Sequence, residues 1–202
     1  MLPREDGTRA DLYALLARLF YAGPDQGLLF TIAQSDDFGT DEAGTNAAGA
    51  LPLFEAWRTL KHAAAMTDAQ SATDEYNEVF ISLGRAPISI FASHYLTANF
   101  KELTLVHLRD EVAALGLGRN DAAQEPEDHL SALLDVLRHL VLRGASPAHL
   151  EAQQRFLNSY LAGWFENFCD LVVALPETAF YKPVAELLRV FLRLELESLA
   201  MT

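Results

Sequence analysis

Apolar residues recur three and four positions apart along almost the whole chain, the spacing that places them on one face of an α-helix. The alternation of apolar and polar residues that is typical of strands is absent outside a short segment around Ile88. Half of the 202 residues are hydrophobic, which is enough for a core and excludes a disordered chain. We therefore expect an all-α protein of about eight to ten helices, folded as a single compact domain over residues 1–202.

Prolines, glycines and capping residues indicate where the helices begin and end. Residues 35–49 are expected to form a loop or a short helix, and residues 85–93 an extended, well-packed loop, because that segment has Pro87 and no helical stripe. In the first part of the chain we expect a helix capped by Thr8 or Asp11 and ended by Gly23-Pro24, one from Asp25, one from Pro52, and one over 68–83 ended by Gly84. In the later part we expect one from His94 or Asn99 to 115 and three more at 126–143, 148–174 and 179–199. Broad apolar faces on the last of these favour a helical globule over a coiled coil.

The charge balance excludes several classes of partner. The chain has 28 acidic and 15 basic residues and a net charge of −13. Such a surface repels the phosphates of nucleic acids and of anionic membranes, and it attracts cationic partners. No apolar run reaches the length of about 18 residues that a membrane helix needs, and the first residues show no basic region followed by an apolar core, so we expect no export signal.

Motifs for catalysis and for metal binding are absent from the sequence. It lacks the His-Glu-x-x-His pair of zinc proteases, a phosphate-binding glycine loop and a Gly-x-Ser-x-Gly turn. His94 and His107 are isolated on expected helices, where a surface or satisfied core histidine is the commoner case. Cys169, the lone cysteine, lies in an apolar stretch and indicates a buried small hydrophobe, which fits the reducing cytoplasm. We expect a protein that is not an enzyme and has no metal or cofactor.

The segment Glu125-Pro126-Glu127-Asp128-His129 has two interpretations. Proline suits the first helical position, and acidic residues in the first turn face the positive end of the helix dipole, so a helix start explains most of it. It does not explain His129. The alternative is a polar cluster whose carboxylates receive guanidinium groups in bidentate fashion. Both interpretations remain open at this point.

A second segment runs from Tyr76 to Gly84 and continues to Pro87, Ser93 and Tyr95. Its simpler interpretation is a helix that ends at Gly84, followed by a packed crossover. Tyr76 and Phe80 are four positions apart, so they share one face of the expected helix.

Together these two segments resemble the TorD/DmsD/NarJ family of chaperones dedicated to molybdenum-containing redox enzymes. The resemblance rests on Tyr-x-x-x-Phe-x-x-x-Gly, then proline and Ser-x-Tyr, then Glu-Pro-x-Asp-His at residues 125–129. It extends over roughly Asp11 to Leu199, because the C-terminal half follows the family's layout at Gln154-x-Phe156, Trp164-Phe165, Phe180-Tyr181, Phe191 and Glu195.

The resemblance implies a cytoplasmic chaperone that binds the twin-arginine signal peptide and the apo-form of a molybdoenzyme catalytic subunit, as a monomer or a domain-swapped dimer. It implies a peptide-binding site made of Glu125, Asp128, His129, Tyr76, Phe80, Ser93 and Tyr95, with structural roles for Pro126, Gly84 and Pro87. Many members have an acidic residue where this chain has Ala92. The loop of this chain therefore has no carboxylate at that position with which to recognise a basic peptide. The alternative is a NarJ-like assembly factor that binds a cytoplasmic-side catalytic subunit without recognising a signal peptide.

Overall fold

The computed structural model describes residues 3–37, 51–82, 86–95, 98–117 and 126–201. Within these ranges the chain forms ten α-helices and one short π-helix, and its only β-type pairing is an isolated bridge between Phe91 and His129. The all-α prediction and the expected number of helices are confirmed. The expected loop over 35–49 lies largely outside the described residues, as does Gly84.

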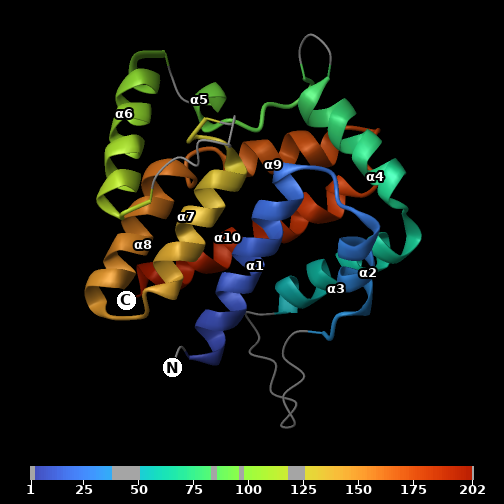
Figure 1. Cartoon of the computed structure of the whole chain (residues 1–202), viewed down its shortest axis with the longest axis horizontal. Coiled ribbons are helices and arrows are strands. Elements are labelled where there is room, and N and C mark those ends of the chain that lie inside the picture. The colour runs from blue at the N-terminus through green and yellow to red at the C-terminus, as the bar shows by residue number, and fades with distance from the viewer. Residues whose placement is uncertain (1–2, 38–50, 83–85, 96–97, 118–125, 202) are drawn as a thin grey trace. The chain divides into compact units, whose positions relative to one another are not determined.

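The helices follow one another along the chain as Figure 1 labels them. They are α1 (Arg4–Tyr21), α2 (Gln26–Gln34), α3 (Leu51–Met66), α4 (Ala69–Tyr76), the π-helix η2 (Asn77–Ile81), α5 (Ala92–Tyr95), α6 (Ala98–Ala114), α7 (Leu130–Leu142), α8 (Pro147–Tyr160), α9 (Phe165–Ala174) and α10 (Tyr181–Ala200).

The chain divides into two compact units, each made of segments that are distant in sequence. The first unit contains α1, α5, α6, α7, α8 and the last residues of α10, and the second contains α2, α3, α4, η2, nearly all of α9 and most of α10. The single domain over residues 1–202 stays a prediction. The first unit comprises Met1–Tyr21, Ser89–Phe165 and Leu196–Thr202, and the second Ala22–Ile88 and Glu166–Glu195.

In the first unit, α1 lies along α7, and α8 packs against α7. The alanines of α1 leave room for this approach, and Ala17 is almost fully buried. One buried polar side chain joins the three helices: Gln153 of α8 donates to the carbonyl of Leu140 in α7 and accepts a hydrogen bond from Arg9 of α1 at 2.8 Å. Because Gln153 is 1% exposed, losing either partner would leave a buried polar atom unsatisfied.

In the second unit, two aspartates begin helices as N-caps. Asp25 accepts a hydrogen bond from the N–H of Leu28 at the start of α2, as the sequence indicates, and Asp68 accepts one from Ser71 at the start of α4. The chain passes close to α4 at Gly23, where an added Cβ would lie 2.6 Å from the Cα of Thr73. Only glycine fits at this approach.

Several expected helix boundaries are wrong. Helix α1 begins at Arg4 rather than near Thr8 or Asp11, because Glu5 and Asp6 already supply the acidic first turn and Thr8 donates to the carbonyl of Arg4 inside the helix. Of the two starts expected for the helix that ends near 115, Asn99 agrees with α6, whereas His94 lies within the short helix α5.

The long helix expected over 148–174 is broken between α8 and α9. The backbone at Leu161 leaves helical geometry, with φ −127° and ψ −44°, and Gly163 lies in the turn that follows. Trp164 stabilises this turn, since its indole N–H donates to the carbonyl of Tyr160 at 2.7 Å. The apolar pattern continues through the break, so the pattern alone does not show it.

The helix expected over 68–83 changes type at Asn77, where α4 gives way to the π-helix η2. The wider π turn keeps both Val79 and Phe80 buried, and the N–H of Ser82 closes it on the carbonyl of Asn77 at 2.7 Å. Pi turns are uncommon and often mark functional segments.

Candidate functional site

The turn at Pro126–His129 precedes α7 and does not form its first turn. The N–H of His129 donates to the carbonyl of Pro126 at 3.1 Å, and α7 begins at Leu130. His129 is the N-cap, and its Nδ1 accepts a hydrogen bond from the N–H of Ser131 at 3.2 Å. The expected helix start at Pro126 is therefore wrong, and the cap explains the histidine that the helix-start interpretation left unexplained.

The segment 89–95, a loop that leads into the short helix α5, lies against this turn. Phe91 and His129 form an antiparallel bridge, in which the N–H of Ala92 donates to the carbonyl of Asp128 and the N–H of Leu130 donates to the carbonyl of Ile90, both at 3.0 Å. The packed loop expected over 85–93 is confirmed at Ile88 and Ile90, which are buried, whereas Ala92 and Ser93 already belong to α5.

Side chains reinforce the contact between the loop and the turn. The Asp128 carboxylate accepts a hydrogen bond from the N–H of Ser93 at 2.9 Å. The Phe91 ring meets the imidazole of His129 edge to face, with ring centroids 5.2 Å apart. Asp128 and His129 are each 3% exposed. We call residues 89–95 and 126–131 together the corner.

Tyr95 forms the aromatic side of the corner. Its hydroxyl donates to the carbonyl of Ser89 at 2.8 Å, and its ring stacks on Trp164 with centroids 5.0 Å apart and planes 13° apart. Four predicted site residues thus come together in the corner: Ser93, Tyr95, Asp128 and His129.

Glu127, which precedes Asp128 in the turn, binds an arginine. Its carboxylate accepts hydrogen bonds from both Nε and Nη2 of Arg109 in α6, at 3.1 and 3.3 Å. The Glu127 side chain is 18% exposed and that of Arg109 is 63% exposed. This is the bidentate pairing of carboxylate and guanidinium that the sequence suggested for this segment, with the guanidinium supplied by the chain itself.

Tyr76 and Phe80 belong to the second unit and are both buried. Their rings lie 5.4 Å apart, which confirms the shared face, and both contact Tyr181, while Phe80 also stacks on Phe168. Beside this cluster the Glu75 carboxylate accepts hydrogen bonds from the N–H groups of Phe180 and Tyr181, at the start of α10.

The remaining predicted site residues have varied positions. Glu125 and Gly84 lie outside the described residues. Pro126 opens the turn before α7, and Pro87 is exposed in the loop that follows η2. Sequence reasoning missed Phe91, Arg109 and Trp164. Only Trp164 had a signal, since it belongs to the C-terminal pattern of the resemblance.

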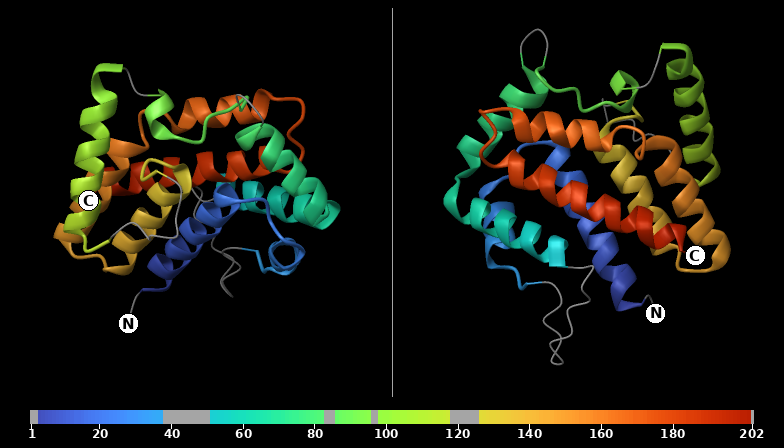
Figure 2. Two further views of the ribbon diagram at one scale, coloured as in Figure 1. Left: turned by 45° about the horizontal axis from the view of Figure 1, so that its top comes forward. Right: turned by 180° about the vertical axis from the view of Figure 1, so that it is seen from behind.

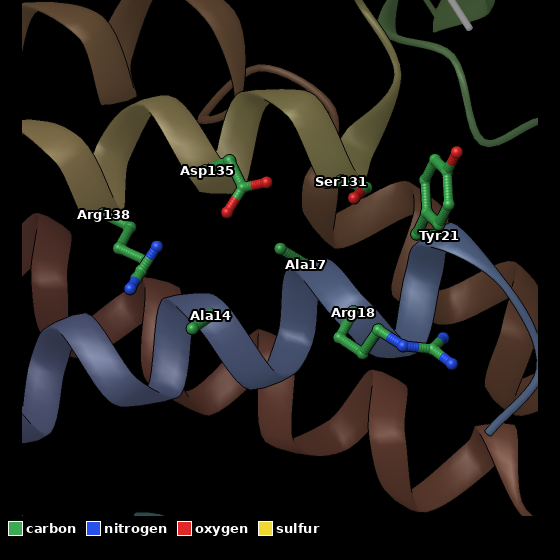
Figure 3. Close-up of a pocket in the computed structure, with 7 residues that line it drawn as sticks. All are labelled: Ala14, Ala17, Arg18, Tyr21, Ser131, Asp135 and Arg138. Carbon is green, nitrogen blue, oxygen red and sulfur yellow. The ribbon is translucent and has the colours of Figure 1, made fainter. Parts of the chain in front are cut away.

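A pocket of about 380 Å³ lies between α1 and α7 in the first unit (Figure 3). Asp135 points into the space between the helices, with Arg138 toward one end and Tyr21 toward the other. Partial burial raises the pKa of Asp135, and attraction to Arg138 offsets part of this effect. The lining is completed by Ala14, Ala17, Arg18 and Ser131.

Cys169 is buried, as the apolar stretch around it predicts. Burial raises the pKa of its thiol to about 12, although the nearby Arg189 opposes this. Among the residues that the structure describes, no three His, Cys, Asp or Glu side chains are grouped so as to hold a metal ion. In the same ranges no helix has the length and apolar character needed to cross a membrane.

Comparison with known proteins identifies the family. Residues 46–170 match the profile described as "Nitrate reductase delta subunit". The chain is 24% identical to Chaperone protein TorD of Aliivibrio fischeri over 209 residues, which cover 95% of this chain and 94% of the relative. It is 29% identical to the same-named protein of Shewanella loihica over 132 residues (62% and 61%) and 25% identical to that of Vibrio parahaemolyticus over 130 residues (60% of each).

These relatives are chaperones, which agrees with the expectation of a protein that is not an enzyme. The match confirms the resemblance inferred from the two motifs. Because the family profile covers more than half of the chain, this protein belongs to the nitrate reductase delta subunit family, the family that includes the TorD chaperones.

Proposed function

We propose that this protein is a cytoplasmic maturation chaperone for a molybdenum-containing oxidoreductase, binding the client's twin-arginine signal peptide and its apo-form until the cofactor is inserted. The observation that carries the proposal is the match to a TorD chaperone over 95% of this chain and 94% of the relative. Binding before export hides the apolar part of the signal and delays export of the unfinished enzyme. The cytoplasmic location follows from this order of events.

The chemistry of the corner supports peptide binding. Glu127 holds a guanidinium in bidentate fashion, which is the contact that a twin-arginine peptide requires. The partly exposed ring of Tyr95 lies in the same unit as Glu127 and offers an apolar contact, and the buried Trp164 on which it stacks holds it in place. The net charge of −13 speeds the encounter with a basic peptide, and salt weakens this effect.

The predicted site residues divide into two kinds. Asp128 and His129 are nearly buried and act by fixing the shape of the corner, together with the backbone of Ser93, and Glu125 remains part of the proposed site. Tyr76 and Phe80 are each 4% exposed, so a peptide reaches them only if their aromatic cluster opens.

A second function is favoured by the name of the matching profile, which describes a nitrate reductase subunit. In this alternative the protein is an assembly factor of the NarJ type, which binds the body of a cytoplasmic-side catalytic subunit and does not recognise a signal peptide. The client's N-terminus distinguishes the two functions, because only the first requires adjacent arginines there. Whether the protein works as a monomer or a domain-swapped dimer stays a prediction that gel filtration with light scattering checks.

The test is calorimetric titration with the N-terminal peptide of the molybdoenzyme encoded nearest to this gene, and with a control in which Lys-Lys replaces Arg-Arg. We expect the first peptide to bind and the control to bind at least about tenfold more weakly, because lysine cannot form the bidentate pair. Asp128→Asn and His129→Ala are expected to weaken binding while the protein stays folded.

Asp11→Asn is the matched control, since it removes one negative charge from an exposed position of α1. Equal affinity for the two peptides, or normal affinity in both corner variants, would count against the proposed site. A complex with the client's folded body, without binding of either peptide, would instead favour the assembly factor.

A further inference from the structure

The contact between Glu127 and Arg109 joins the corner to α6. Two guanidinium nitrogens of Arg109 meet the two carboxylate oxygens of Glu127 at 3.1 and 3.3 Å. The pair separates easily from the solvent side, because the arginine is 63% exposed while the glutamate is 18% exposed. The carboxylate is therefore part of the corner, whereas the guanidinium comes from α6, which lies outside the corner.

Glu127 and its neighbour Asp128 differ in whether their carboxylates can bind an arginine that arrives from solvent. Asp128 is 3% exposed and already receives the N–H of Ser93. A guanidinium arriving from solvent reaches the Glu127 carboxylate without dismantling the contact between the loop and the turn. Of these two carboxylates, Glu127 is the one placed to bind an incoming arginine.

We propose that the Glu127 carboxylate binds an arginine of the client's signal peptide. Arg109 is then an intramolecular competitor, which pairs with this carboxylate until the peptide arginine displaces it. The proposal rests on the proposed function and assigns two residues of the same site. It adds Glu127 and Arg109 to the site residues that the resemblance implies, neither of which is among them.

The attachment of α6 fits such an exchange. Over the described side chains 105–114, Leu108 alone is buried. Other contacts of this part of α6 are polar: Glu111 pairs with Arg155 at 3.4 Å and accepts a hydrogen bond from the hydroxyl of Tyr160 at 2.9 Å. Polar contacts at a surface exchange with water at little cost, and α6 lies beside α8 in all the views of Figures 1 and 2.

The strength of the Arg109 pair sets the size of the expected effect. An exposed ion pair of good geometry favours the paired state by at most about fivefold, so the Arg109 contact is open in at least about one molecule in six. Since apparent affinity scales with the fraction competent to bind, removing the pair should tighten peptide binding by about three- to fivefold.

The experiment titrates the wild type and Arg109→Gln with two peptides, one with Arg-Arg and one with Lys-Lys, each followed by the same apolar stretch. We expect Arg109→Gln to bind the Arg-Arg peptide about three- to fivefold more tightly, with a smaller gain for Lys-Lys. Glu127→Gln should weaken Arg-Arg binding, and adding Arg109→Gln to it should restore nothing, because the site of competition is gone.

Arg155→Gln is the matched control, since it breaks the other arginine–glutamate pair of α6 at a similarly exposed arginine. If Arg155→Gln tightens peptide binding as much as Arg109→Gln does, then loosening α6 in general improves access to the site. That result would overturn the proposed competition at Glu127. Peptide binding that Arg109→Gln leaves unchanged would overturn the inference alone. If neither peptide binds either the wild type or Arg109→Gln, the proposed function fails with it.

Discussion

The side chain of Asp128 accepts a hydrogen bond from the backbone N–H of Ser93, 35 residues earlier in the chain, at 2.9 Å. The backbone carbonyl of the same aspartate accepts the N–H of Ala92 at 3.0 Å. One residue therefore fixes two successive peptide groups of the loop against the start of α7. This double contact gives Asp128 a structural role whether or not a peptide is present.

Replacing Asp128 separates its charge from its hydrogen bond. Asp128→Ala should lower the free energy of unfolding by about 1–3 kcal/mol, because the N–H of Ser93 loses its acceptor in a nearly buried site. Asp128→Asn should cost less than about 1 kcal/mol, since its amide oxygen can still accept. Urea denaturation of the three proteins measures the difference. Equal stability of the alanine variant and the wild type would contradict this role.

His129 caps α7 through Nδ1, and its replacement tests the cap. His129→Ala should lower the free energy of unfolding by about 1 kcal/mol, and His129→Asn should restore most of it because asparagine is a strong N-cap. Hydrogen exchange in the first turn of α7 should accelerate in the alanine variant alone. If alanine and asparagine behave alike, packing of the ring on Phe91 is the main contribution of His129 and the cap is not.

The start of α7 illustrates what the sequence could predict. Apolar spacing predicts the helix itself, because Leu133, Leu134, Leu137 and the residues that follow them must share a buried face. It could not predict the first residue, since a proline fits both the first helical position and the turn before it. The bridge to Ile90 and Ala92 decides between them, and that pairing depends on the tertiary fold.

The candidate site follows the same division. Tyr76 and Phe80 share a face as their spacing predicts, but the change to a π-helix leaves no mark in the apolar pattern. The motif at 126–129 is visible in the sequence, whereas its partner Arg109 is not, because nothing local relates a residue of α6 to one 18 positions later. Contacts between segments were the part that could not be predicted.

Glu75 caps the start of α10, and this role was not visible in the sequence. Its two oxygens accept the N–H groups of Phe180 and Tyr181 at 2.9 and 2.7 Å, where the helix dipole also favours negative charge. Glu75→Gln should lower the free energy of unfolding by about 1–2 kcal/mol in urea denaturation. Glu78→Gln, an exposed glutamate of the following π-helix, is the control and should change stability by less than about 0.5 kcal/mol.

Cys169 should be inert to thiol reagents in the folded protein. Its pKa of about 12 reflects burial, and at pH 8 it leaves about one thiolate in ten thousand. A colorimetric thiol reagent should therefore react negligibly with the native protein and fully after addition of guanidinium chloride. Cys169→Ser identifies the background. Rapid modification of the native protein at pH 8 would contradict the burial of this side chain.

Asp135 should make a small, pH-dependent contribution against folding. Its pKa is raised in the folded state by partial burial in the pocket between α1 and α7. Above that raised value the folded protein holds a charge that the unfolded chain solvates better, so the free energy of unfolding falls as pH rises from the unfolded pKa. Asp135→Asn should remove this penalty and stabilise the protein at pH 7, by less than about 1 kcal/mol because solvent screens the site. At about pH 3 the aspartate is protonated in both states, and the two proteins should have equal stability.

Urea denaturation at both pH values, with Asp11→Asn as the control for a lost surface charge, measures the difference. A gain that persists unchanged at the acidic pH would assign the effect to packing and not to the carboxyl group.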